Sequence, residues 1–291
     1  MSFSFLASSV SERGGKITAG PPVVVASHPR SGTHLFIDLL RRHLPCCEAW
    51  KWPGERLDRL YLSIDELGAR RNRLDEATAR RIVRRCERPL VKTHAWPGYT
   101  ETFLEPHHEG LPECWQQWLS QEATVLYVYR DGRDVLASYQ LMRARMDAEA
   151  ETIDLGGFIR QSDPRARRNR VARWARHVRE WRSHPDVMTV SFEQILSAPK
   201  QIIQKVADKM DVEPSFNRPL LPERFSSIWE SRWARLFRVR PESTAVLGTG
   251  SQEWQQALSQ DDRSFFHEEA GDLLLDLGYV SSEAWISSKE Q

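Results

Sequence analysis

Residues 22–34 read PVVVASHPRSGTH, and this stretch decides the fold. Its first half, residues 22–27, is a short β-branched run of the kind found in strands buried on both faces of a parallel sheet. A turn that contains proline and glycine follows, and residues 35–44 then show the leucine spacing of a helix. Strand, turn and helix in this order predict the start of a βαβ unit.

The same order returns along the chain. Three further short apolar runs are strand candidates: residues 90–94, 123–130 and 187–192. Helical segments alternate with them at residues 75–88, 135–145 and 199–210. This alternation predicts an α/β fold with a doubly wound, mostly parallel sheet flanked by helices.

The rest of the chain is less regular. Residues 160–182 are crowded with arginine, which we interpret as a solvated helix face, with a buried stripe formed by Trp174, Val178 and Trp181. Residues 222–251 predict a loop that covers the site. We therefore expect a flexible lead-in at 1–20, one domain at 21–285 and a short tail at 286–291.

Composition excludes several classes of protein. The 291 residues include 41 basic and 40 acidic side chains, so the net charge of +1 gives no general attraction to nucleic acid or membranes. The apolar N-terminal stretch is too short for a signal peptide, and no run of 18 apolar residues predicts stable membrane insertion. Four cysteines without a C-x-x-C pair indicate reduced thiols, and hence a cytoplasmic protein.

The turn after the first strand is a candidate anion site. It reads Ser27-His28-Pro29-Arg30-Ser31-Gly32-Thr33-His34. A small turn at a helix N-terminus offers backbone N–H groups and the positive end of the helix dipole, while Arg30 adds charge and Ser31 and Thr33 add hydroxyl donors. The alternative is a plain βα turn with a serine or threonine cap.

Two further segments follow strand candidates. Arg130 ends the strand at 123–130, and Ser138 lies eight residues later, so both could meet one phosphate at the carboxyl edge of the sheet. The alternative is that the arginines and aspartates at 130–134 only pair with one another. Lys92-Thr93-His94 ends another strand, and side chains two apart on a strand share a face.

Together these segments resemble the PAPS-dependent sulfotransferases (PAPS is 3′-phosphoadenosine-5′-phosphosulfate). That family carries P-K-S-G-T after its first strand, then K-T-H, then Y-x-x-R-x-x-x-D-x-x-x-S. The counterparts here are residues 29–33, 92–94 and 127–138, in the same order. Residues 174–181 and 190–193 also resemble the family's later helix and strand, so the resemblance runs from about 21 to 254.

The resemblance implies a P-loop-like sulfotransferase fold and an in-line transfer of a sulfuryl group from PAPS to an acceptor hydroxyl or amine, with PAP as product and no metal required. It assigns catalysis to His94 as general base, with Lys92 and Arg30 stabilising the leaving phosphate. The residues it implies for donor binding are Arg30, Ser31, Gly32, Thr33, His34, Arg130, Ser138 and Phe192.

The sequence departs from the family at several positions. Arg30 stands where lysine is usual, Leu35 stands where many members have tryptophan, and Phe192 stands for a tyrosine that contacts adenine. The usual R-K-G before G-x-W is missing near residues 246–254, so Arg238 or Arg240 is a substitute candidate for the 3′-phosphate contact.

The acceptor is predicted only as a class: a small molecule, glycan or lipid. Aromatic residues near the expected base, which are candidates for its pocket, are Trp50, Trp52, Trp96 and Tyr99. Two other functions stay open. A P-loop-like nucleotide or small-molecule kinase would need a G-x-x-x-x-G-K-[ST] loop, which is absent, and an inactive nucleotide-binding protein would not need Lys92 and His94.

Overall fold

The structure is a computed structural model, and every structural statement below concerns the residues that it describes. These are residues 16–49, 60–67, 74–98, 113–120, 123–146, 153–163, 168–221, 224–225, 245–246 and 253–287.

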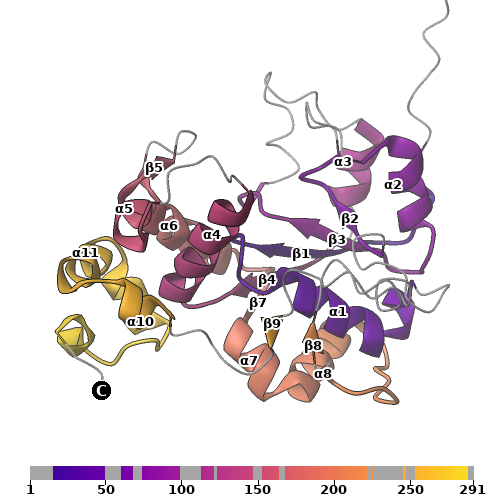
Figure 1. Ribbon diagram of the computed structural model, residues 1–291. Helices are drawn as coiled ribbons and strands as arrows, with labels where there is room; N and C mark the ends of the chain where they lie inside the picture. The colour runs from indigo at the N-terminus through magenta and orange to yellow at the C-terminus, as the bar shows by residue number, and fades with distance from the viewer. Residues whose placement is uncertain are drawn as a thin grey trace, which may run out of the picture.

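A five-stranded parallel sheet forms the centre of the fold (Figure 1), in the order β2-β3-β1-β4-β7. The strands are β1 (Val23–Ser27), β2 (Leu62–Ser63), β3 (Leu90–Thr93), β4 (Thr124–Tyr129) and β7 (Met188–Ser191). The predicted doubly wound parallel sheet is thus confirmed. β2 was not predicted, because two residues are too few to show a pattern.

Helices cover both faces of this sheet (Figure 1). On one side lie α1 (Thr33–His43), α7 (Phe192–Ser197) and α8 (Pro199–Met210). On the other side lie α2 (Glu76–Val83), α3 (Glu113–Ser120), α4 (Gly132–Met146) and α6 (Arg170–Arg182). The remaining elements are η1 (Pro45–Cys47), α5 (Leu155–Arg160), α10 (Glu253–Ala257), α11 (Gln260–Asp276), η4 (Glu283–Ile286) and the short pairs β5 (Ser162–Asp163) with β6 (Arg168–Asn169) and β8 (Arg224–Phe225) with β9 (Ala245–Val246).

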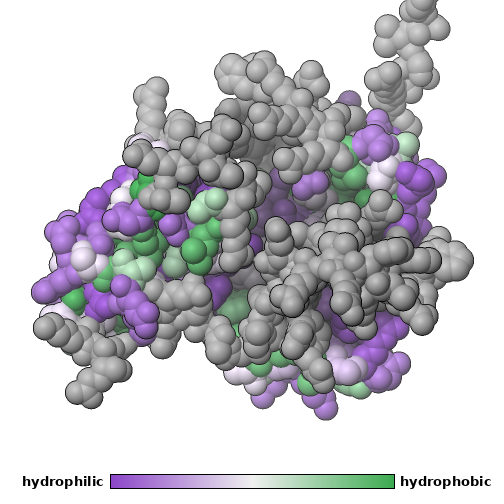
Figure 2. Space-filling view, in the orientation of Figure 1, coloured by the Kyte–Doolittle hydropathy of each residue, from purple (hydrophilic) through white to green (hydrophobic). Residues whose placement is uncertain are grey.

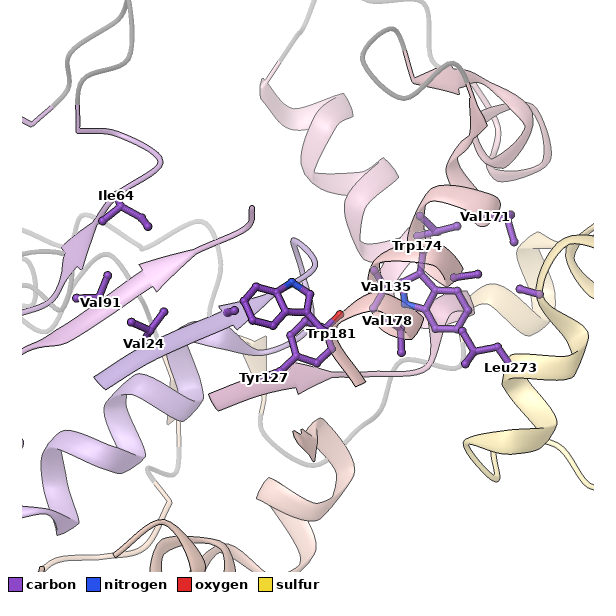
Figure 3. Packing of buried hydrophobic residues seen from close by; sticks show 14 of the residues in the cluster. Val24, Ile64, Val91, Tyr127, Val135, Val171, Trp174, Val178, Trp181 and Leu273 are labelled. Carbon is purple, nitrogen blue, oxygen red and sulfur yellow. The ribbon is translucent and has the colours of Figure 1, made fainter. Parts of the chain in front are cut away.

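Alternating strand residues feed two hydrophobic clusters, one on each face. Val24, Val91 and Tyr127 join the cluster under α4 and α6, which Figure 3 shows from close by. Val23 and Val25 join the cluster under α1 and α8 instead. Because side chains alternate across a strand and both faces of this strand are covered, β1 is buried along its whole length, and this explains its apolar run at residues 23–26.

The arginine-rich region was predicted as one helix face over 160–182, and that prediction was wrong in extent. α5 ends at Arg160, the β5–β6 pair intervenes, and α6 begins after Asn169, whose side chain accepts the N–H of Ala172 as a helix cap. The buried stripe of Trp174, Val178 and Trp181 is confirmed.

The arginines of α6 also do more than face solvent. Arg179 pairs with Asp272 at 2.6 Å, and Arg182 pairs with Asp276, so two ion pairs join α6 to α11. This contact was missed because the partner aspartates lie about 90 residues away in the sequence.

The described surface is mixed in character. Figure 2 shows hydrophilic residues interspersed with small hydrophobic patches, and the large hydrophobic side chains that are exposed among the described residues are Leu141, Ile153 and Leu275. Within the same residues no helix is both long and apolar enough to cross a membrane. At the N-terminal end, Ile17 is buried in the core, and the Gly20 carbonyl accepts the indole N–H of Trp118.

Candidate functional site

The candidate site lies at the carboxyl edge of the sheet. β1 ends at Ser27, β3 at Thr93, β4 at Tyr129 and β7 at Ser191, and all of these strands run parallel. Strands β2 and β3 lie on one side of β1, and the later strands β4 and β7 lie on the other, so the winding of the chain reverses at β1. Open α/β sheets bind ligands at this point. The predicted segments therefore meet at one edge.

The turn from Ser27 to Thr33 is tightly folded onto the start of α1. Arg30 and Gly32 both have left-handed backbones, with φ of 73° and 93°. Ser27 Oγ and Thr33 Oγ1 lie 2.5 Å apart in a buried hydrogen bond. The Ser31 hydroxyl is buried too, yet it has no hydrogen-bond partner among the described residues. A buried hydroxyl at a helix N-terminus is suited to an oxyanion.

Phe192 packs directly against this turn. A Cβ atom placed on Gly32 would lie 2.3 Å from Cδ2 of the Phe192 ring, which leaves room for glycine alone. The same ring also contacts Arg130, whose guanidinium lies over it, 4.6 Å from the ring centre. Phe192 therefore joins the turn after β1 to the segment after β4.

Replacing Gly32 with alanine should lower the melting temperature more than replacing Gly278, which also has a positive φ of 74° but has nothing within 4 Å of its Cβ position. Both variants force alanine into a left-handed backbone at about 1–2 kcal/mol. Only Gly32→Ala adds a collision with Phe192, worth about 1–3 kcal/mol more. Thermal unfolding measures both, and equal losses would show that the Phe192 contact is not as close as described.

Lys92 and His94 lie on one side of the site. Lys92 is buried, and it shares the strand face of Leu90, which packs in the α1 cluster. His94 Nδ1 lies 2.8 Å from the Ser27 carbonyl oxygen. Because a carbonyl can only accept, Nδ1 carries the proton and Nε2 carries the lone pair. Burial, and next the positive charge of Lys92, lower the pKa of His94 well below 6.5, so the ring is neutral at pH 7.

A second set of bonds, which the sequence did not reveal, holds the residue after His94. The Ala95 carbonyl accepts the Nε2–H of His177 and the indole N–H of Trp181, each at 3.1 Å. His177 Nδ1 is then left to accept the hydroxyl of Tyr127 at 2.9 Å. The only sequence signal was the expected buried stripe of α6, to which Trp181 belongs.

His34 lies close to the positive charges of the site. Burial, followed by the charges of Lys92 and Arg30, lowers its pKa to about 3. Its Nε2 is 2.9 Å from the hydroxyl of Tyr61, a partner that precedes β2 and was not predicted. A neutral histidine near two cations can offer a hydrogen bond without adding charge.

The segment from Arg130 to Ser138 makes two contacts that the sequence did not predict. Ser138 Oγ accepts from Nε of Arg30 at 3.0 Å, while Arg130 pairs with Asp134 at 3.2 Å. Ser138 therefore contacts the turn after β1. Burial raises the pKa of Asp134 to about 6 despite the Arg130 charge. Arg130 Nε has no hydrogen-bond partner in the described part of the chain.

Not all predicted acceptor residues can be placed. Trp50, Trp52 and Tyr99 lie outside the described residues, as do Arg238 and Arg240. Trp96 is half-buried, with its ring 4.9 Å from His177. The described residues contain no group of three or more His, Cys, Asp or Glu side chains that could hold a metal ion.

The chain belongs to the sulfotransferase domain family, whose pattern matches residues 20–241. This range covers every segment described above as part of the site. No curated protein matches the sequence significantly.

Solved structures of sulfotransferase-type proteins share the fold. Retinol dehydratase bound to androsterone and PAP is 16% identical, with a TM-score of 0.51 over 89% of this chain and 82% of that one. The retinol and PAP complex of retinol dehydratase is 15% identical, with a TM-score of 0.52 over 89% and 83%. Mouse sulfotransferase SULT7A1 with PAP is 14% identical, with a TM-score of 0.51 over 92% and 89%. At these identities the likeness is one of fold.

Proposed function

We propose that this protein transfers a sulfuryl group from PAPS to a hydroxyl or amine of a small-molecule, glycan or lipid acceptor. The observation that carries the proposal is the neutral His94, whose Nε2 holds a lone pair beside buried Lys92 at the edge where the Ser27–Thr33 turn begins α1. A base, a cation and an anion-binding turn are the three parts that an in-line transfer of a charged group requires.

The residues present fit a donor with two phosphate groups. The unpartnered Ser31 hydroxyl and the turn around Gly32 are proposed to hold the 5′-phosphate, with His34 and Thr33 beside it. Arg130, whose Nε is also unpartnered among the described residues, is proposed to hold the 3′-phosphate. Phe192, packed between these two parts, is proposed to contact the nucleoside.

When bound, PAPS supplies the sulfuryl group, and its phosphate side leaves as PAP. His94 Nε2 accepts the proton of the acceptor, because Nδ1 is already committed to Ser27. Lys92 and Arg30 stabilise the negative charge that grows on the leaving phosphate. Ser138 holds Nε of Arg30 and so fixes the direction of that side chain. We also propose, as the sequence led us to expect, that the transfer requires no metal ion.

The acceptor is proposed to lie against the aromatic side of the site. Trp96 lies two residues after His94, and the rings of His28 and Trp96 both contact His177, at 5.7 and 4.9 Å. Tyr139 continues this wall, 6.4 Å from His28. Ring faces of this kind commonly line pockets for small organic ligands.

A cytoplasmic location also stays a prediction. The four cysteines of the structure are free thiols.

Radiolabelled PAPS and a library of alcohols, phenols and amines test the proposal. We expect transfer of label to at least one acceptor, at the same rate with excess EDTA, and a rise in melting temperature with PAP that exceeds the rise with ATP and magnesium. Loss of transfer in EDTA that magnesium restores would contradict the expectation that no metal is required, and stabilisation by ATP and magnesium without transfer of label would favour the kinase alternative. Stabilisation by PAP without transfer to any acceptor would favour an inactive nucleotide-binding protein.

A further inference from the structure

One carboxylate reaches all three residues of the Lys92-Thr93-His94 segment. Asp65, in the turn after β2, accepts the Thr93 hydroxyl at 2.9 Å through Oδ1 and the His94 backbone N–H at 2.9 Å through Oδ2. Its Oδ2 is also 3.7 Å from the Lys92 ammonium. No other described carboxylate is bonded to this segment, and sequence reasoning did not single out Asp65.

The donors that converge on Asp65 suit a carboxylate and no other side chain of its size. The Thr93 hydroxyl oxygen already accepts the backbone N–H of Ala95 at 3.0 Å, so its proton is directed to Asp65. With the His94 N–H and the Lys92 ammonium, three donors face one group. An ionised carboxylate is acceptor-only, whereas an amide would turn a donor toward one of them.

The distance between the Lys92 ammonium and Asp65 determines how the two groups interact. At 3.7 Å the Lys92 nitrogen and the Asp65 oxygen attract each other but are too far apart for a hydrogen bond. The Lys92 ammonium is therefore attracted toward Asp65, while its N–H groups stay available to donate to another acceptor. Lys92 can keep this attraction while it donates to a leaving phosphate.

The burial of Asp65 disfavours its charge. Burial raises the pKa of its carboxyl, although Lys92, Thr93 and His94 lower it in part. A carboxyl whose folded pKa lies above its unfolded value stabilises the fold below the unfolded pKa, and this contribution is lost as the pH rises through the folded pKa. At pH 7 the Asp65 charge therefore opposes folding, as is common for groups kept for function.

We propose that Asp65 is a positioning residue for sulfuryl transfer: its carboxylate fixes the His94 backbone and directs Lys92, so that base and cation meet the same reacting centre. This inference rests on the proposed function, since it assigns a role within that site. Asp65 touches neither donor nor acceptor in this scheme and acts through Lys92 and His94.

The test is Asp65→Asn in the full chain, with labelled PAPS and the acceptor found for the wild type. We expect kcat to fall about 10- to 100-fold, the scale that small misplacements of reacting groups produce. The KM for PAPS and the affinity for PAP should stay within about threefold, because the turn and Arg130 are untouched. Asp65→Glu, which restores the charge on a longer side chain, should recover part of the lost kcat.

Glu66→Gln is the matched control, since it removes the same charge from the next, exposed residue and should leave kcat unchanged. The melting temperature of Asp65→Asn should stay close to that of the wild type. A wild-type kcat in Asp65→Asn, or equal losses of kcat and PAP affinity in both Asp65 variants, would overturn the positioning role. A wild-type enzyme that transfers to no acceptor would instead overturn the proposed function, and this role with it.

Discussion

Replacing His94 with alanine should lower turnover by about 10²–10⁴-fold, the usual cost of losing a general base. The affinity for PAP should stay within about threefold, because His94 bonds to Ser27 and not to the hydroxyl of Ser31, which is proposed to meet the 5′-phosphate. Turnover, PAP affinity and melting temperature are measured on one preparation. A parallel fall in all three would identify His94 as a core residue only.

His94→Asn separates the two roles more sharply. The asparagine side-chain N–H can replace Nδ1–H and keep the bond to the Ser27 carbonyl, but it offers no atom in the place of Nε2. This variant should be as inactive as His94→Ala and more stable. His184→Ala, at an exposed histidine, is the control and should change neither property. Turnover near the wild-type level in His94→Asn would remove Nε2 from the mechanism.

The pH dependence of kcat gives an independent check on the same residue. Since burial and Lys92 lower the pKa of His94, the neutral base form should persist in mildly acidic solution. The acid limb of the kcat profile should therefore lie below pH 6.5, the ordinary value for histidine. A limb at or above pH 6.5 would show that the base is another group or that His94 is better solvated than described.

The sheet and the position of the site could be predicted because both depend on local sequence. β1 is buried on both faces, which explains why its residues are apolar up to Ser27, and the strands β3, β4 and β7 ended within two residues of their predicted ends. In a parallel sheet all carboxyl ends share one edge. The residues that follow each strand were therefore predictable as neighbours without any knowledge of the helices between them.

The supporting contacts could not be predicted, because each joins segments that are distant in sequence. Asp65 follows a strand of only two residues, which shows no periodicity, and it meets Thr93 after 28 positions. The bond from Tyr127 to His177 spans 50 positions. The bond from Arg30 to Ser138 could not be predicted either, because spacing measures separation along the chain and not the direction of a side chain that belongs to another loop.

The two arginines after β4, Arg130 and Arg133, have different surroundings. Arg133 is buried and pairs with Asp131 at 2.6 Å, with its guanidinium 4.1 Å from the Trp254 ring centre and 4.8 Å from that of Trp285. It thus joins α4 to the C-terminal segment. The alternative prediction, that residues 130–134 only pair with one another on the surface, holds for the pairing but not for the exposure. Arg130, with one nitrogen unpartnered among the described residues, is the arginine suited to a ligand.

Replacing Arg130 with alanine should weaken PAP binding by about 1.5–3 kcal/mol, the scale of a hydrogen bond to a charged group. That energy corresponds to roughly 10- to 150-fold in dissociation constant. AMP, which lacks the 3′-phosphate, should bind the variant about as well as the wild type, since only the 3′-phosphate is assigned to Arg130. The carboxyl of Asp134 loses its partner, but with a pKa of about 6 it can take up a proton and limit the cost to folding.

Calorimetry with PAP and AMP on the same protein separates this role from a structural one. Arg133→Ala is the matched control, because it removes the same charge at a position three residues after Arg130. The Arg133 guanidinium lies against the rings of Trp254 and Trp285. This variant should lower the melting temperature, and any loss of affinity should be equal for the two ligands. If Arg130→Ala also weakened PAP and AMP equally, Arg130 would act through Phe192 and the packing of the turn, and the 3′-phosphate would have to be held by another group.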